Sequence, residues 1–179
     1  MIYIIDTETT GIANTDQIIE LAWINVGNEV SSLEPLDTFQ QYYKPSVPIH
    51  PKAQEVHGLS ADKLKNYPSS ILAKIPADTS IGIFHNASFD MRMLGKPDIK
   101  SICTMKLAKK ITKELNVDLG GSNSLRNLFT FFYPDLSGDF LTLYHGAEAD
   151  CKMTLAILIA LLKFYPHIET LEQLERYIK

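Results

Sequence analysis

The pattern of apolar and polar residues changes character after the first quarter of the chain. That quarter holds three apolar runs with the composition of β-strands, at 1–6, 18–26 and 39–43. The first run ends in a carboxylate, and the second is the segment IIELAWINV, with turn residues Gly27 and Asn28 directly after it. Strands this close in sequence predict an antiparallel meander.

Beyond this meander, strand-like and helix-like patterns alternate. Leu107, Ile111 and Leu115 recur every four residues, which predicts a helix over 104–115. A long, largely apolar run predicts a buried helix over 147–163, which ends before Pro166. The other predicted elements are strands at 79–84 and 98–103 and helices at 60–65, 69–75, 87–94, 124–132 and 170–179.

Strands followed by alternating helices and strands predict an α/β fold. We expect a central mixed five-stranded β-sheet with helices on both faces. The length of 179 residues fits one domain. We therefore expect a domain over 1–165 and a C-terminal helical tail over 166–179 that packs on it.

Composition narrows the class of protein. Hydrophobic residues make up 45% and charged residues 21%, which is typical of globular domains and excludes disorder, collagen-like and coiled-coil structures. No run approaches the ~20 apolar residues that a membrane span needs, and the N-terminus has no basic leader. Cys103 and Cys151 form no disulfide framework, so we expect a reducing, cytoplasmic setting. A net charge of −4 disfavours binding of nucleic acid over a wide surface but permits brief binding of a strand end.

Acidic residues stand where a globular core does not favour them. Asp6 and Glu8 end the first strand, in DTETTG, and residues two apart in a strand share a face. Burying two like charges side by side is costly unless a cation is shared. Asp90 and Asp150 each fall in the first turn of a predicted helix, where the helix dipole favours an anion. Taken singly, each of these acids could also be an ordinary solvated group.

Together, the four acids indicate a metal site. Carboxylates select hard divalent ions such as Mg²⁺ or Mn²⁺, and two such ions can clamp a phosphoryl group in an in-line displacement. The five histidines lack the spacing of zinc ligands. His145, five residues before Asp150, is the candidate for the base that takes a proton from water, since its ordinary pKa lies near working pH.

With these acids in this order, the chain resembles a known family, the DEDDh 3′→5′ exonucleases, which include the proofreading subunits of bacterial replicases. The resemblance rests on three blocks in order, namely DTETTG, HNASFD and HGAEAD, which contain Asp6 and Glu8; Asn86, Phe89 and Asp90; and His145, Ala147 and Asp150. A sister group carries tyrosine four residues before the last aspartate; Gly146 stands there, so the histidine branch fits better.

Two further segments support the resemblance, which covers 1–162. The stretch KPSVPIHPKAQEVHGLSADKL at 44–64 is similar to a conserved stretch of the family, and ICTMKLAKK at 102–110 is most similar to the small bacterial exodeoxyribonuclease X group. The family implies an RNase H-like fold with the carboxylates at its centre.

The resemblance also implies roles for individual residues. Asp6, Glu8, Asp90 and Asp150 would hold two Mg²⁺ or Mn²⁺ ions, and His145 would deprotonate the attacking water. The segment containing Thr7, Thr9, Thr10, Gly11 and Ile12 would lie along the terminal nucleotide. Val56 and His57 would touch its base, with Asn86 and Phe89 completing the pocket.

Several of these residues also have a simpler interpretation. Phe89 could be core, His57 a loop residue, and Asn86 the cap of the helix that begins at residue 87. Candidates for contacts with the incoming strand are Arg92, Lys106, Lys109, Lys110 and Lys113. The four lysines could equally form a solvated helix face.

Four functions follow from the sequence. The first is a freestanding, metal-dependent 3′→5′ exodeoxyribonuclease that removes 5′-mononucleotides from single-stranded or frayed DNA 3′ ends, in repair or replication. The second is a proofreading subunit that needs a DNA polymerase; the compact tail after Lys163 disfavours a long tether. The third is an exoribonuclease of the same fold, and the fourth a non-catalytic interaction module. Four retained carboxylates argue against the last.

Overall fold

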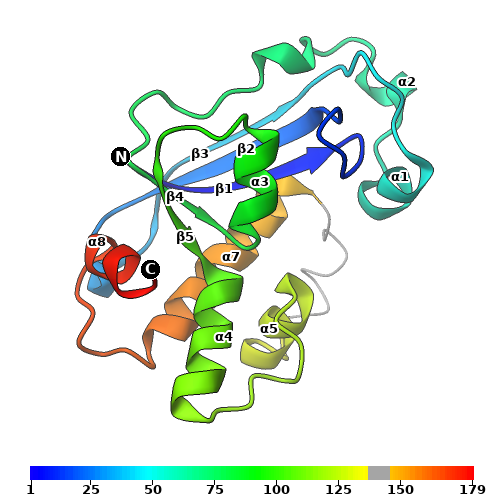
Figure 1. Ribbon diagram of the computed structural model, residues 1–179. Helices are drawn as coiled ribbons and strands as arrows, with labels where there is room; N and C mark the ends of the chain where they lie inside the picture. Colours follow the sequence, from blue (N-terminus) through cyan, green and yellow to red (C-terminus); the bar gives the residue numbers. More distant parts are fainter. Residues whose placement is uncertain (137–145) are drawn as a thin grey trace.

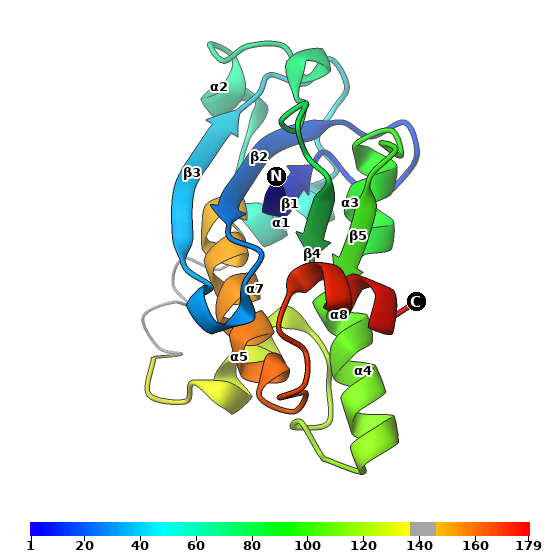
Figure 2. The same cartoon turned by 90° about the vertical axis from the view of Figure 1, so that its left-hand side faces the viewer.

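The computed structural model describes residues 1–136 and 146–179, and a five-stranded sheet lies at its centre (Figure 1). The strands lie in the order β3-β2-β1-β4-β5, which Figure 2 shows from the side. β1 pairs antiparallel with β2 and parallel with β4, so the predicted mixed sheet is confirmed. The strands are β1 (Ile2–Thr9), β2 (Ile18–Val26), β3 (Pro35–Tyr42), β4 (Ile81–Phe84) and β5 (Lys100–Cys103).

Two strands are longer than the sequence pattern predicts. β1 continues past its apolar run to Thr9, because β2 pairs with it along its whole length. β3 begins at Pro35 and its first residues are exposed, since it is an edge strand of the sheet. An exposed edge strand has no apolar alternation to mark its start.

Most helices lie where their patterns place them. The predicted 69–75 helix is only a short 3₁₀ turn, and a helix at 51–57 was not predicted. No helix among the described residues combines the length and apolarity needed to cross a membrane. The helices are α1 (Pro51–His57), α2 (Ala61–Leu64), α3 (Ala87–Met93), α4 (Thr104–Leu115), α5 (Leu125–Phe132), α7 (Ala147–Leu162) and α8 (Leu171–Tyr177), with 3₁₀ turns η1 (Val30–Ser32) and η2 (Ser70–Leu72).

Alternate residues of β1 enter two separate cores. Ile2 and Ile4 face a large core that also includes residues of α4, α5, α7 and α8. Tyr3 and Ile5 face a smaller core on the other side, where α3 packs. Figure 1 shows α3 in front of the sheet and α7 behind it. Because side chains alternate along a strand, Asp6 and Glu8 continue the row that faces α7, and Thr7 the row that faces α3.

β1 extends beyond its parallel neighbour. β4 pairs only with residues 2–4 of β1, so the segment from Asp6 to Thr9 has a strand partner only in β2. The chain leaves β4 at Phe84 and enters α3 three residues later. The carboxyl end of β1 therefore lies open between α3 and α7.

Candidate active site

Four carboxylates line one small cavity at the open end of β1. Its volume is about 180 Å³. Asp6 and Glu8 come from β1, Asp90 from α3 and Asp150 from the first turn of α7. The structure thus brings together the acids that the sequence analysis singled out. The other lining residues are Thr7, His85, Asn86, Phe89 and Leu125.

Three of these acids form the tightest group. One carboxylate oxygen each from Asp6, Glu8 and Asp150 can be chosen so that all three atoms lie within 4.8 Å of one another. Asp150 is only 7% exposed, and the other two are half-buried. Oxygen ligands at this separation and depth are the donor set that a hard divalent ion prefers.

Asp90 approaches the group from the opposite face of the sheet. It is 4% exposed, and its Oδ1 accepts a hydrogen bond from the Thr7 hydroxyl at 2.9 Å. Thr7 points toward α3 because it lies between Asp6 and Glu8 on the strand. The Thr7 hydroxyl therefore orients Asp90, in a position where the sequence analysis expected a nucleotide contact.

The carboxylates are crowded and poorly solvated. Burial, together with the charges of Asp90 and Asp150, raises the pKa of Asp6 well above its usual range. Burial and the neighbouring acids raise the pKa of Glu8 to about 9. Burial also raises the pKa of Asp90 to about 7, although the bond from Thr7 acts in the opposite direction. Among the described residues, no lysine or arginine lines this cavity, so a divalent cation fits the charge that the site leaves unbalanced.

This crowding predicts a pH-dependent stability in the absence of metal. The raised pKa of Glu8 means that the folded state binds more protons than the unfolded state between pH 4.5 and about 9. The free energy of unfolding should therefore fall as pH rises through that window, and added Mn²⁺ should remove the fall. Thermal unfolding followed by circular dichroism in EDTA and in Mn²⁺ measures both effects.

A variant isolates the contribution of one acid. We expect Glu8→Gln to raise Tm in EDTA at pH ~8 by about 2–4 °C, since the folded parent must take up a proton at Glu8 at this pH and the glutamine need not. Glu34→Gln, at an exposed position before β3, is the control and should leave Tm unchanged. An unchanged or lower Tm for Glu8→Gln in EDTA would contradict the crowding.

A second cavity, of about 640 Å³, adjoins the first and shares Thr7, Glu8 and Phe89 with it. The turn after β1 forms one wall. Asp16 holds this turn by accepting hydrogen bonds from the Thr10 hydroxyl and the Ala13 N–H, both at 2.7 Å. A Cβ on Gly11 would come within 2.6 Å of the Asp16 carboxylate, so a larger residue there would displace the side chain that holds the turn.

The side chains of this turn divide between support and exposure. The Thr9 hydroxyl donates to the Gly11 carbonyl at 2.7 Å, and Thr10 is fully buried. Both hydroxyls therefore brace the turn. Ile12 is 80% exposed, and it lines the cavity together with Thr9 and Gly11.

α1 forms the opposite wall of this cavity, with Val56 and His57 among the lining residues. His57 is half-buried, and its Nδ1 accepts from the Leu59 N–H at 3.0 Å. Burial lowers the pKa of His57, so a neutral ring with its hydrogen on Nε2 is favoured. His57 is therefore a cavity wall residue and not a solvated loop residue.

Asn86 and Phe89 both line the carboxylate cavity, and Phe89 also lines the larger one. Asn86 occupies the N-cap position of α3, but its side chain makes no cap hydrogen bond and instead accepts from the Ser88 hydroxyl at 3.1 Å. Phe89 is half-buried and lines both cavities, so it is not simply part of the core.

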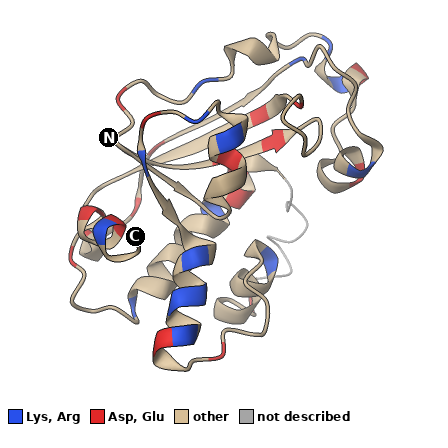
Figure 3. Ribbon diagram, viewed as in Figure 1, with Lys and Arg blue, Asp and Glu red and all other residues tan. Residues whose placement is uncertain are grey.

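The residues predicted to contact the incoming strand differ in their side-chain partners and exposure. Arg92 donates to Asn14 at 3.2 Å and lies 5.5 Å from the centre of the Phe89 ring, which places it beside the larger cavity. Lys110 pairs with Glu114 at 2.7 Å and lies over the Tyr177 ring. Lys106, Lys109 and Lys113 are exposed on α4, the helix that carries the row of basic residues in Figure 3.

Other site residues were missed or fall outside the structure. His145, predicted as the base, lies outside the described residues. His85 lines the carboxylate cavity, where its Nε2 donates to the Asn123 carbonyl at 2.9 Å and burial lowers its pKa to about 4. Glu20 is buried within β2, opposite Glu8. The sequence signal that could have identified Glu20 is the presence of an acid inside the apolar run IIELAWINV.

Comparisons with known proteins agree with this geometry. A sequence model of the family RNase_T, described as Exonuclease, matches residues 3–158. Exodeoxyribonuclease 10 of Escherichia coli (strain K12) is 32% identical over 163 residues, covering 89% of this chain and 67% of that protein. DNA polymerase III subunit epsilon of Rickettsia prowazekii (strain Madrid E) is 29% identical over 172 residues, covering 88% and 72%.

Solved structures share the fold. The structure of exonuclease X in complex with 5′ overhanging duplex DNA aligns with a TM-score of 0.67 at 24% identity, over 100% of both chains. The predicted RNase H-like exonuclease fold is confirmed by this likeness and by the observed sheet.

Proposed function

The chain belongs to the exonuclease family, and on that premise we propose that it is a metal-dependent 3′→5′ exodeoxyribonuclease of the DEDDh branch. It would release 5′-mononucleotides from DNA 3′ ends. The observation that carries the proposal is the single cavity lined by four carboxylates from three separate elements. The similarity to an exodeoxyribonuclease supports DNA as the substrate.

The chemistry is assigned to residues of this chain. Asp6, Glu8, Asp90 and Asp150 would hold two Mg²⁺ or Mn²⁺ ions, and Thr7 would fix the orientation of Asp90. Bound ions of this kind supply positive charge that activates water and stabilises the leaving oxygen. His145 would take the proton of the attacking water.

The larger cavity is the proposed place of the terminal nucleotide. The braced turn from Thr9 to Ile12 would lie along the sugar and phosphate, while Val56, His57 and Phe89 would contact the base. Arg92 and the exposed lysines of α4 would contact phosphates further along the strand, which is a salt-dependent, sequence-independent interaction. We place the whole site in one domain, residues 1–165, with the tail of 166–179 packed on it.

A digestion experiment tests the function. DNA and RNA of equal sequence, labelled at the 3′ end in one set and at the 5′ end in another, are incubated with the purified chain in Mg²⁺, Mn²⁺ or EDTA. We expect 5′-mononucleotides from DNA with either metal, shortening from the 3′ end, and no product in EDTA. Absence of digestion in both metals, or equal rates in EDTA, would contradict the proposal.

The other arms of this experiment separate the alternatives. Faster digestion of RNA would identify an exoribonuclease. Digestion only after a DNA polymerase is added would identify a proofreading subunit, a function that the similarity to DNA polymerase III subunit epsilon favours as the second candidate. A preference for DNA would be consistent with the proposed role in DNA repair or replication, whereas a preference for RNA would contradict it.

A further inference from the structure

Glu20 is a buried acid that the proposed mechanism does not use. It lies on β2 directly opposite Glu8 of β1 and is only 1% exposed. A buried carboxylate is costly unless hydrogen bonds satisfy it. Its partners therefore indicate what it does.

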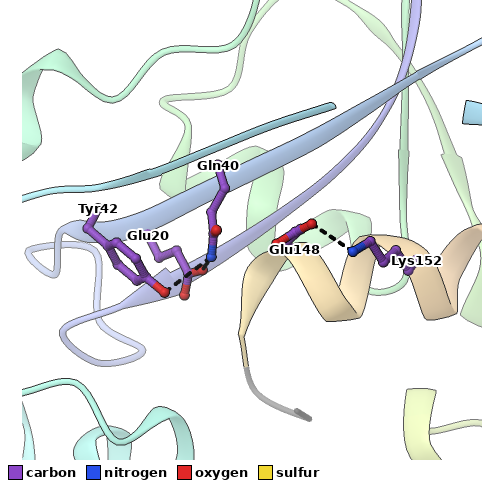
Figure 4. Close-up of polar contacts among 5 residues, drawn as sticks. All are labelled: Glu20, Gln40, Tyr42, Glu148 and Lys152. Carbon is purple, nitrogen blue, oxygen red and sulfur yellow. Dashed lines mark hydrogen bonds and ion pairs between the residues drawn. The ribbon is translucent and has the colours of Figure 1, made fainter. Parts of the chain in front are cut away.

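The partners of Glu20 come from two other elements. Gln40 Nε2, on the edge strand β3, donates to its Oε1 and also to the Tyr42 hydroxyl (Figure 4). The Tyr42 hydroxyl lies within hydrogen-bonding reach of the Glu20 carboxylate as well. The third partner is the backbone N–H of Ala147, the first residue of α7. Glu20 thus joins β2, β3 and the beginning of α7.

Within the described part of the chain, this contact supplies an acceptor that the N-cap residue of α7 cannot provide. The first N–H groups of a helix have no partner within the helix, and a side chain at the N-cap usually accepts from them. The N-cap residue of α7 is Gly146, which has no side chain, and the structure shows no side-chain cap bond there. Glu20 provides the acceptor from a neighbouring strand, and its negative charge suits the positive end of the helix dipole.

The same turn carries Asp150. The Asp150 N–H donates to the Gly146 carbonyl at 3.0 Å, so Asp150 closes the turn that begins beside Ala147. A shift or fraying of this turn relative to β2 would change the position of the Asp150 carboxylate relative to Asp6 and Glu8, with which it now forms a close group.

From these contacts we infer that Glu20 is a positioning residue, which anchors the first turn of α7 and thereby holds Asp150 in the carboxylate group. The inference rests on the proposed function only for its consequence, a tighter divalent-ion site. Partners that orient metal ligands typically account for 10–100-fold in metal affinity.

Two substitutions of similar size separate the hydrogen bond that Glu20 accepts from Ala147 from the negative charge of Glu20. Glu20→Gln and Glu20→Met both remove the negative charge and both relieve a buried acid, but only glutamine retains an oxygen that can accept from Ala147. The control is Glu148→Gln, because Glu148 lies in the same turn but pairs outward with Lys152 at 2.7 Å (Figure 4).

Amide hydrogen exchange in EDTA tests the anchor without metal or substrate. We expect the Ala147 N–H to exchange about tenfold faster in Glu20→Met than in the parent, with the centre of α7 unchanged, and Glu20→Gln and Glu148→Gln to stay near the parent. Unchanged Ala147 exchange in Glu20→Met overturns the inference, whether or not the parent is a nuclease.

Calorimetric titration with Mn²⁺ alone tests the consequence. We expect Glu20→Met to bind Mn²⁺ at least about tenfold more weakly and to lose kcat with KM nearly unchanged, and Glu20→Gln to recover most of both. Parental Mn²⁺ affinity in Glu20→Met would make Glu20 merely structural and overturn the positioning role. A parent that binds no Mn²⁺ would instead contradict the proposed function, while the exchange result would still decide the anchor.

Discussion

Replacement of Asp150 by asparagine will reduce 3′→5′ digestion of DNA by at least about 10³-fold, because the loss of one proposed metal ligand would remove several kcal/mol of charge stabilisation in the transition state. Asp150 is the most constrained acid of the tight group, since it is buried and its turn is attached to β2 through Ala147. Single-turnover digestion of 5′-labelled DNA in saturating Mn²⁺ measures the loss.

The same helix turn offers the control for this variant. Glu148→Gln lies two residues earlier and changes an acid that pairs with Lys152 on the outer side, so its rate should remain near that of the parent. Asp150→Asn should also keep its fold, which circular dichroism in EDTA verifies. Parental digestion by Asp150→Asn would remove the carboxylate cavity from the mechanism.

Replacement of His145 by alanine will lower kcat by about 10²–10⁴-fold, the usual contribution of a general base. Its role stays a prediction from the sequence. If His145 acts as a base, the parent should lose activity as pH falls through the ordinary histidine pKa of about 6.5, and the variant should lack this acid limb. A kcat–pH profile of both proteins at saturating metal provides the measurement.

A second histidine provides the control, which shows whether the loss of activity is specific to His145 or follows from removal of any imidazole. His167 is exposed and contacts the rings of Tyr165 and Tyr177, on the side of α8. His167→Gln should keep both the parental rate and the acid limb. Near-parental rates for His145→Ala would assign proton removal to another group.

The fold could largely be predicted because apolar periodicity marks its buried elements. β2 and α4 have the predicted bounds, because β2 is buried along nearly its whole length and α4 has one buried face. α1 was missed because none of its residues is buried, so it carries no apolar period. Its bounds are set instead by Pro51 at the first helical position and by Gly58, which ends it with φ +69°.

The four acids could be proposed as a group because Asp6 and Glu8 share one face at the end of an apolar strand and because all four stand in blocks that resemble the exonuclease family. The support around them could not, because it depends on which face of the sheet a residue occupies. Thr7 resembled a substrate contact until its direction toward Asp90 was known. Glu20 stands out as an acid in an apolar strand, but its role depends on Gln40 and Ala147, which come beside it only in the folded chain.

The assembly of the site from distant segments has a consequence for synthesis of the protein. Asp6 emerges first from the ribosome, whereas Asp150 and the helix that contacts β1 and β2 emerge much later. Because contacts between remote segments form only when both are available, a nascent chain that ends before α7 has no complete carboxylate cavity. We therefore expect nuclease activity that depends on this cavity only after most of the polypeptide has been made.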